Sequence, residues 1–204
     1  MDPKSTVSML STTDAIVLSL QPHSDKAYIL HAYTRAGGRI NYMVYGVGRK
    51  HAIGMYTPLS LIQITADHSP AKPPTVKEAT RLTSNSDLTA NIYKQTIALF
   101  ISEVLFHVLR HPMTDEPMFD FLTDSINELS TLPEPQNFHL HFLIGFAAKL
   151  GFEIPESSNL YHRLTPYTRK ERQEALHALC DYFEEHVETW QTPKSLDVLM
   201  EVFD

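Results

Sequence analysis

The hydrophobic pattern changes its period once along this 204-residue chain, near Asn85, and that change constrains the fold more than any single motif. Before Asn85, apolar residues occur in short alternating runs separated by Gly, Pro and polar turns, which is typical of β-strands. After Asn85, they recur at intervals of three and four residues, which is typical of amphipathic helices. We therefore expect an α+β protein in which strands come first and helices follow.

The front part predicts five short strands with no helical segment between them. Gly37 and Gly38 predict a hairpin turn between the second strand and the third. In the fifth strand, alternation places Val76, Thr80 and Leu82 on one face of the sheet. Such a series favours a small closed or nearly closed barrel over an α/β arrangement. The predicted ranges are 15–20, 27–33, 40–47, 59–65 and 75–82.

The back part predicts helices with recognisable ends. One periodic apolar stretch covers 97–109 and ends before Pro112, and a second begins near Pro117. The segment 138–150 is apolar on all sides, which predicts a central, buried helix, and Gly151 is expected to end it.

Two further helices are predicted near the C-terminus. Thr168 and Glu171 form a capping-box pattern that opens a helix running to about Val187. Thr192 and Pro193 are expected to cap a short last helix. The segment from Glu153 to Tyr167 is predicted to be a loop.

Charge divides the chain in the same way as the hydrophobic pattern does. Residues 1–85 carry nine Lys and Arg against five Asp and Glu, whereas residues 86–204 carry eight against nineteen. The front part therefore suits a polyanion, and the back part as a whole would repel one. We predict two domains, 1–84 and 85–204, with different partners.

Several function classes are not favoured by the sequence. No apolar run is long enough for a membrane helix, and the polar N-terminal stretch has no signal-peptide character, so a cytoplasmic protein is expected. Cys180 is the one cysteine, which excludes an internal disulfide and a cysteine-based zinc site. No nucleophile elbow, Walker loop or dinucleotide fingerprint is present, so we predict no catalytic residues, no cofactor and no small-molecule substrate.

Histidine spacing does not predict a metal site. His139 and His141 lie two residues apart on a predicted helix, so their side chains point to different sides. His107 and His111 have helical i, i+4 spacing, but no acid or cysteine at ligand spacing completes their coordination sphere.

The stretch RINYMVYGVGRK, residues 39–50, is the strongest candidate for a binding surface. Single-stranded nucleic acids are bound by aromatic rings that stack on bases and by cations that follow the phosphates. Tyr42 or Tyr45 would supply the ring, and nearby arginines and a lysine would supply the charge. The alternative is that the tyrosines are half-buried barrel residues and the cations form a solvated rim. The predicted nucleic-acid-binding residues are Arg35, Arg39, Tyr42, Arg49, Lys50 and Arg81.

The order of several motifs resembles the RecO family of DNA repair proteins, and most closely its Bacteroides-type members. The resemblance covers most of residues 14–204, and each motif alone is short. The matching segments are Ile16–Leu18, Tyr33–Arg35, Gly38–Arg39, Gly46–Lys50, Pro58–Leu61, Val76–Ala79, Ala98–Glu103, Asn137–Phe142 and Lys194–Leu199.

The resemblance implies a five-stranded OB-fold barrel over residues 1–84 and an all-α domain over residues 85–204. It also implies a non-catalytic recombination mediator that binds single- and double-stranded DNA, anneals strands and, with RecR, helps load RecA on DNA coated by single-stranded-DNA-binding protein (SSB). The acidic C-terminal tail of SSB is expected to dock on the helical domain, where Arg110 and Lys149 are candidate contacts. Such a protein would be cytoplasmic and associated with the nucleoid.

Two departures from the family pattern bear on function. The region between the third helix and the last two is short, with no room for the zinc element or hairpin that relatives often carry there. The net charge is −7, whereas many DNA-binding proteins are basic. A protein-interaction adaptor of the repair machinery, with little DNA binding of its own, therefore remains the alternative.

Overall fold

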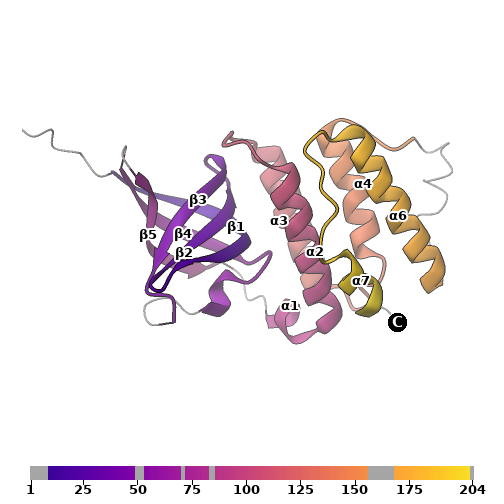
Figure 1. Cartoon of the computed structure of the whole chain (residues 1–204), viewed down its shortest axis with the longest axis horizontal. Coiled ribbons are helices and arrows are strands. Elements are labelled where there is room, and N and C mark those ends of the chain that lie inside the picture. The colour runs from indigo at the N-terminus through magenta and orange to yellow at the C-terminus, as the bar shows by residue number, and fades with distance from the viewer. Residues whose placement is uncertain (1–8, 49–52, 70–71, 83–85, 156–167, 203–204) are drawn as a thin grey trace, which may run out of the picture. The chain divides into compact units, whose positions relative to one another are not determined.

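The computed structural model describes residues 9–48, 53–69, 72–82, 86–155 and 168–202. It confirms the predicted α+β class, with an N-terminal five-stranded OB-fold barrel followed by helices (Figure 1). Arg49, Lys50 and most of the predicted loop before Tyr167 lie outside the described residues.

The barrel closes in the strand order β1-β2-β3-β5-β4, with β1 completing the circle by pairing with β4. The N-terminal half of β1 pairs with β4 and its C-terminal half pairs with β2. These two pairings extend β1 beyond the predicted strand at both ends. The sequence did not predict the added residues, because most of them are polar and carry no hydrophobic signal. The strands are β1 (Met9–Ser24), β2 (Ala27–Thr34), β3 (Gly38–Tyr45), β4 (Leu61–Ser69) and β5 (Lys72–Arg81), and a short 3-10 helix, η1, covers Ile53–Tyr56.

The barrel is stabilised by apolar side chains that point inward from all five strands. Burying one aliphatic side chain of this size contributes on the order of 1.5–3 kcal/mol, so the interior is the main source of stability of this unit. The interior residues are Ala15, Val17, Leu30, Ala32, Tyr42, Val44, Tyr56, Ile62, Ile64, Ala66, Val76 and Ala79.

The predicted faces of the fifth strand are wrong after Val76. Val76 pairs with Ala66, but the neighbouring residue Thr65 pairs with Glu78, so Lys77 is an extra residue in β5. Such a bulge inverts the alternation of side chains beyond it. Ala79 therefore joins Val76 in the interior, while Lys77 is exposed and its Nζ lies 3.1 Å from Asp67 Oδ2.

The helices confirm most of the predicted ends. Gly151 follows the last residue of α4 and has a φ of 90°, as expected for a left-handed C-cap. Thr168 and Glu171 form the predicted capping box at the start of α6. The helices are α1 (Ser86–Ala90), α2 (Ile92–Val108), α3 (Glu116–Thr131), α4 (Phe138–Leu150), α6 (Arg169–His186) and α7 (Leu196–Val202).

The predicted cap of the last helix is wrong, because α7 begins at Leu196 rather than directly after Pro193. The Leu196 amide donates to the Pro193 carbonyl, which makes a turn ahead of the helix. Ser195, the residue before α7, donates its amide and its hydroxyl to Glu103 Oε2 on α2, at 2.9 and 2.7 Å. A carboxylate of α2 therefore accepts both hydrogen bonds that Ser195 donates directly before the helix begins.

The chain packs into two compact units. One contains Met1–Asn85 together with Leu109–Thr123, and the other contains Ser86–Val108 together with Asp124–Asp204. We call them the barrel unit and the helical unit. The last barrel strand ends at Arg81, and the barrel unit also includes Leu109–Thr123, which contains the first two turns of α3. The division of the chain after residue 84 stays a prediction. Within the described ranges, no helix is both long enough and apolar enough to cross a bilayer.

Candidate nucleic-acid interface

The outer face of β2 and β3 is a candidate binding surface, because OB-fold proteins bind oligonucleotides on the face of their second and third strands. Side chains alternate along both strands, and Leu30, Ala32, Tyr42 and Val44 point into the barrel. The residues between them point outward. The outward cross-strand pairs are Tyr33 with Arg39, His31 with Asn41, Ile29 with Met43, and Ala27 with Tyr45.

The assignment of Tyr42 as a base-stacking residue is wrong. Its side chain is 1% exposed and belongs to the barrel interior. Burial also raises the pKa of the Tyr42 hydroxyl to about 12. Tyr45, three residues further on, lies on the outer face and is 50% exposed, so it is the tyrosine of this strand whose ring is accessible to a base.

Arg35 lies in the turn between β2 and β3 and already has partners within the barrel unit. Its Nη2 donates to Asp120 Oδ1 at 2.7 Å, and its guanidinium lies 4.5 Å from the centre of the Phe119 ring. Phe119 also stacks on Tyr33, with ring centres 6.3 Å apart. The first turns of α3 therefore cover the Tyr33 end of the outer face and neutralise the charge predicted to meet a phosphate.

Arg39 is half-buried, beside the segment that follows α2. Its backbone amide donates to the His111 carbonyl at 3.3 Å. Burial lowers the pKa of the Arg39 guanidinium, and the charge of Arg110 lowers it further. The structure thus brings Arg39 close to Arg110, which the sequence assigned to a different partner.

The remaining predicted cations are not part of this group. Arg81 ends β5, is exposed, pairs across the sheet with Ile62 and donates to the Gly54 carbonyl of η1. It therefore does not belong to the β2–β3 ladder. Arg49 and Lys50 follow Gly48 outside the described residues, so their role stays a prediction.

His31 and Asn41 form a polar pair at the centre of the outer face that sequence reasoning missed. His31 Nδ1 and Asn41 Oδ1 are 2.7 Å apart. Burial lowers the pKa of His31 and the Arg39 charge acts in the same direction, while the hydrogen bond to Asn41 opposes them. The hairpin turn at Gly37 and Gly38 fixes the register that sets residue 31 opposite 41, so counting back from the turn would have found this pair.

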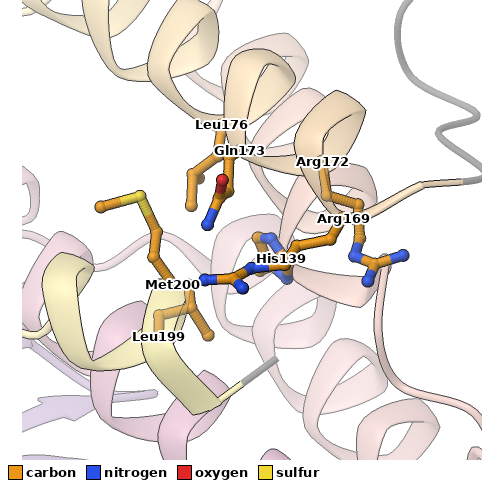
Figure 2. A pocket seen from close by; sticks show the side chains of 7 residues that line it. All are labelled: His139, Arg169, Arg172, Gln173, Leu176, Leu199 and Met200. Carbon is orange, nitrogen blue, oxygen red and sulfur yellow. The ribbon is translucent and has the colours of Figure 1, made fainter. Parts of the chain in front are cut away.

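A second candidate site lies in the helical unit. Figure 2 shows a pocket in which side chains of α6 face those of α7 around the buried ring of His139. Burial, followed by the charge of Arg172, lowers the pKa of His139 to about 3, so this ring is neutral at physiological pH. The lining residues are His139, Arg169, Arg172, Gln173, Leu176, Leu199 and Met200.

This pocket contains neither of the partner-binding residues suggested by the sequence. Lys149 is exposed on α4 but does not line the pocket, and Arg110 belongs to the barrel unit. The two lining arginines come from the first turn of α6, where the capping box starts the helix. Among the described residues, no group of three or more His, Cys, Asp or Glu is arranged to hold a metal ion.

The fold and these sites define an OB-fold protein with a helical C-terminal part. Comparisons with known proteins identify the family within this class. Residues 9–83 match the family described as "Recombination protein O N terminal", and residues 89–160 match "Recombination protein O C terminal". The chain belongs to the RecO family, whose members act in DNA repair and recombination.

Curated relatives named DNA repair protein RecO cover nearly the whole chain. The Phocaeicola vulgatus protein is 31% identical over 240 residues, and the Bacteroides fragilis protein is 28% identical over 242. The Porphyromonas gingivalis protein is 26% identical over 246 residues. Each alignment covers 96% of this chain and 100% of the relative. Because these alignments are longer than this chain, the relatives carry residues that have no counterpart here.

Proposed function

We propose that this protein is a non-catalytic recombination mediator. It binds single- and double-stranded DNA, anneals complementary strands and, with RecR, helps to load RecA onto DNA coated by SSB. The observation that best supports DNA binding is the outer face of β2 and β3, where Arg39 lies near Arg110 and the exposed Tyr45 lies on the same face. A cytoplasmic, nucleoid-associated location follows from this function.

The proposed mechanism is electrostatic. Arginine side chains displace counterions from the phosphates, and Tyr45 stacks on one base of a single strand. Two complementary strands held in this way repel each other less and pair more readily. Because the whole chain carries a net charge of −7, we expect modest affinity that depends strongly on salt.

The test is a titration of fluorescent single-stranded and duplex oligonucleotides at increasing salt, together with an annealing assay on labelled complementary strands. If about four phosphates are neutralised, the logarithm of the binding constant falls with the logarithm of salt at a slope near −3 for single strands. A flat salt response, or no annealing above the rate of the free strands, contradicts the proposal.

The pocket of the helical unit suits the acidic, hydrophobic tail of SSB. Arg169 and Arg172 offer two cations to carboxylates, while Leu199 and Met200 offer an apolar surface to an aromatic side chain. We expect a labelled tail peptide to bind the wild-type protein. Arg172→Glu should weaken this binding and Lys149→Glu should not. If only the Lys149 change weakens it, the tail docks elsewhere on the helical unit.

An adaptor with little DNA binding is the second candidate. Two observations favour it: the excess of acidic residues after residue 85, and the ion pair that already occupies Arg35. The same two titrations separate the candidates, because an adaptor binds the tail peptide and leaves the oligonucleotide free.

A further inference from the structure

The side-chain amide of Asn41 is held in one orientation on the outer face of the barrel. Its Oδ1 lies 2.7 Å from His31 Nδ1, and because an amide oxygen can only accept, Nδ1 is the donor of this hydrogen bond. His31 is buried and lies directly opposite Asn41 on the neighbouring strand. The Asn41 oxygen is therefore turned toward His31, and its NH2 group is the part that a ligand can reach.

This NH2 group lies on an accessible part of β3. Asn41 is exposed, and among the described residues none accepts a hydrogen bond from its Nδ2. Tyr45 follows four residues later on the same outer face and is also exposed. Strand geometry separates the two positions by roughly 13 Å, at about 3.3 Å per residue. A single strand that stacks one base on Tyr45 and runs along β3 therefore brings another base over Asn41.

We infer that Asn41 reads a base of single-stranded DNA: its Nδ2 donates to a carbonyl oxygen of the base, and His31 positions the amide. This inference rests on the proposed DNA binding. A group that only donates favours bases that present acceptors in its direction. Thymine has carbonyl oxygens at two positions, whereas adenine has none and presents an amino donor instead. We therefore expect the site next to Tyr45 to prefer thymine.

The test compares two oligonucleotides on the full-length protein, one made of thymidines and one in which difluorotoluene replaces every thymine. The replacement keeps the shape of the base and still stacks, but it has no carbonyl oxygen. The readout is the ratio of the two binding constants. This ratio should be about twofold to tenfold lower in Asn41→Ala than in the wild-type protein, which corresponds to the loss of one hydrogen bond.

Three further variants separate base reading from a folding defect. Asn41→Asp keeps an acceptor for His31 but has no NH2 group, so its ratio should fall as in Asn41→Ala, while the added charge weakens both oligonucleotides equally. Tyr45→Ala should weaken both and keep the ratio, because the ring stacks on either base. Gln63→Ala removes an exposed side-chain amide from β4, outside the β2–β3 ladder, and should leave binding and ratio unchanged.

The positioning role of His31 has its own variant. His31→Phe removes the donor that holds the amide, so the ratio should fall part of the way toward that of Asn41→Ala, and an unchanged ratio contradicts this role. The inference as a whole is overturned by equal ratios in the wild-type protein and Asn41→Ala, or by a wild-type ratio in Asn41→Asp. Failure of the proposed function is seen separately, because the wild-type protein would then bind neither oligonucleotide, and this inference falls with it.

Discussion

Arg35 and Asp120 form an ion pair with Nη2 2.7 Å from Oδ1, which ties the β2–β3 turn to the second turn of α3. The pair is open to solvent, with the two side chains 37% and 59% exposed, so its contribution to stability is only about 0–1 kcal/mol. Its main consequence is electrostatic, because the carboxylate lies where a DNA phosphate would otherwise meet the arginine.

Asp120→Asn should therefore strengthen DNA binding by about twofold to fivefold at low salt, since it frees the Arg35 charge and removes a repulsive one. Oligonucleotide titration at two salt concentrations measures the effect. Asp124→Asn makes the same change in net charge at an exposed position of the same helix. Equal gains in both variants would mean that net charge alone is responsible.

Tyr45→Ala should weaken binding of single strands by about 1–3 kcal/mol, the usual contribution of one base stacked on an aromatic ring. Tyr42→Phe should leave binding unchanged, because the Tyr42 ring is inside the barrel and stays there. Titrations with single-stranded and duplex probes report both effects, and the loss in Tyr45→Ala should be larger for the single strand. A binding defect in Tyr42→Phe with unchanged stability would contradict the assignment of Tyr42 to the barrel interior.

Gly38→Ala should destabilise the barrel unit strongly. Gly38 has a φ of 61°, which costs about 1 kcal/mol or more for a residue with a Cβ, and the clash with the Met113 backbone adds about 1–3 kcal/mol. Gly48→Ala is the control, since its φ of 85° carries the first cost, but none of the described residues has an atom within 4 Å of the added Cβ. Urea unfolding followed by circular dichroism compares them, and equal losses would rule out the close approach as the cause.

Glu103→Ala should destabilise the helical unit by about 2–3 kcal/mol, because it removes the acceptor of both the amide and the hydroxyl of the buried Ser195. Ser195→Ala removes the hydroxyl alone and should cost about 1 kcal/mol. Thermal unfolding measures the difference. Equal losses in the free energy of unfolding of the two variants would contradict the role of Glu103 as the acceptor of both hydrogen bonds.

Acid should destabilise the protein through His139. Its pKa is about 3 in the folded state against 6.5 for an unperturbed side chain, so below pH 6.5 the unfolded chain binds a proton that the folded chain does not. The contribution of His139 to the free energy of unfolding is fully present above pH 6.5. It decreases between pH 6.5 and 3, by at most about 1.4 kcal/mol per pH unit. Urea unfolding between pH 7 and 5 measures this slope, a range in which most carboxylates remain ionised.

His139→Gln should flatten this part of the pH profile, although the variant itself loses some stability. His177→Gln is the matched control, because it removes an exposed histidine of α6 in the same unit whose charge is not among those that lower the pKa of His139, and it should keep the wild-type slope. If both variants show the wild-type slope, the acid sensitivity comes from other groups.

The sequence predicted the strands and helices well where local signals were strong. The capping box at Thr168 and the glycine after Leu150 are short-range features, and both appear at the predicted positions. The start of α7 could not be predicted in the same way, because Ser195 is bound by Glu103, which lies 92 residues earlier in the chain. The bulge at Lys77 was also hidden, since it depends on how β5 pairs with β4.

The candidate site was harder to predict than the fold. Alternation along β3 separates residues into two faces, but it does not say which face is the interior, and both faces of this strand carry a tyrosine. Tyr42 was therefore chosen along with residues of the opposite face. The proximity of Arg39 to Arg110 depends on the return of the chain to the barrel after α2, for which the sequence carries no local signal.

That return has a practical consequence for anyone who divides the protein into pieces. A fragment cut at the junction of strands and helices would lack Leu109–Thr123, and with it the ring that covers Tyr33 and the partner of Arg35. Such a fragment would expose a new apolar surface and would lose Arg110. A chimera that exchanges the barrel between relatives should therefore exchange two segments together, the barrel strands and Leu109–Thr123.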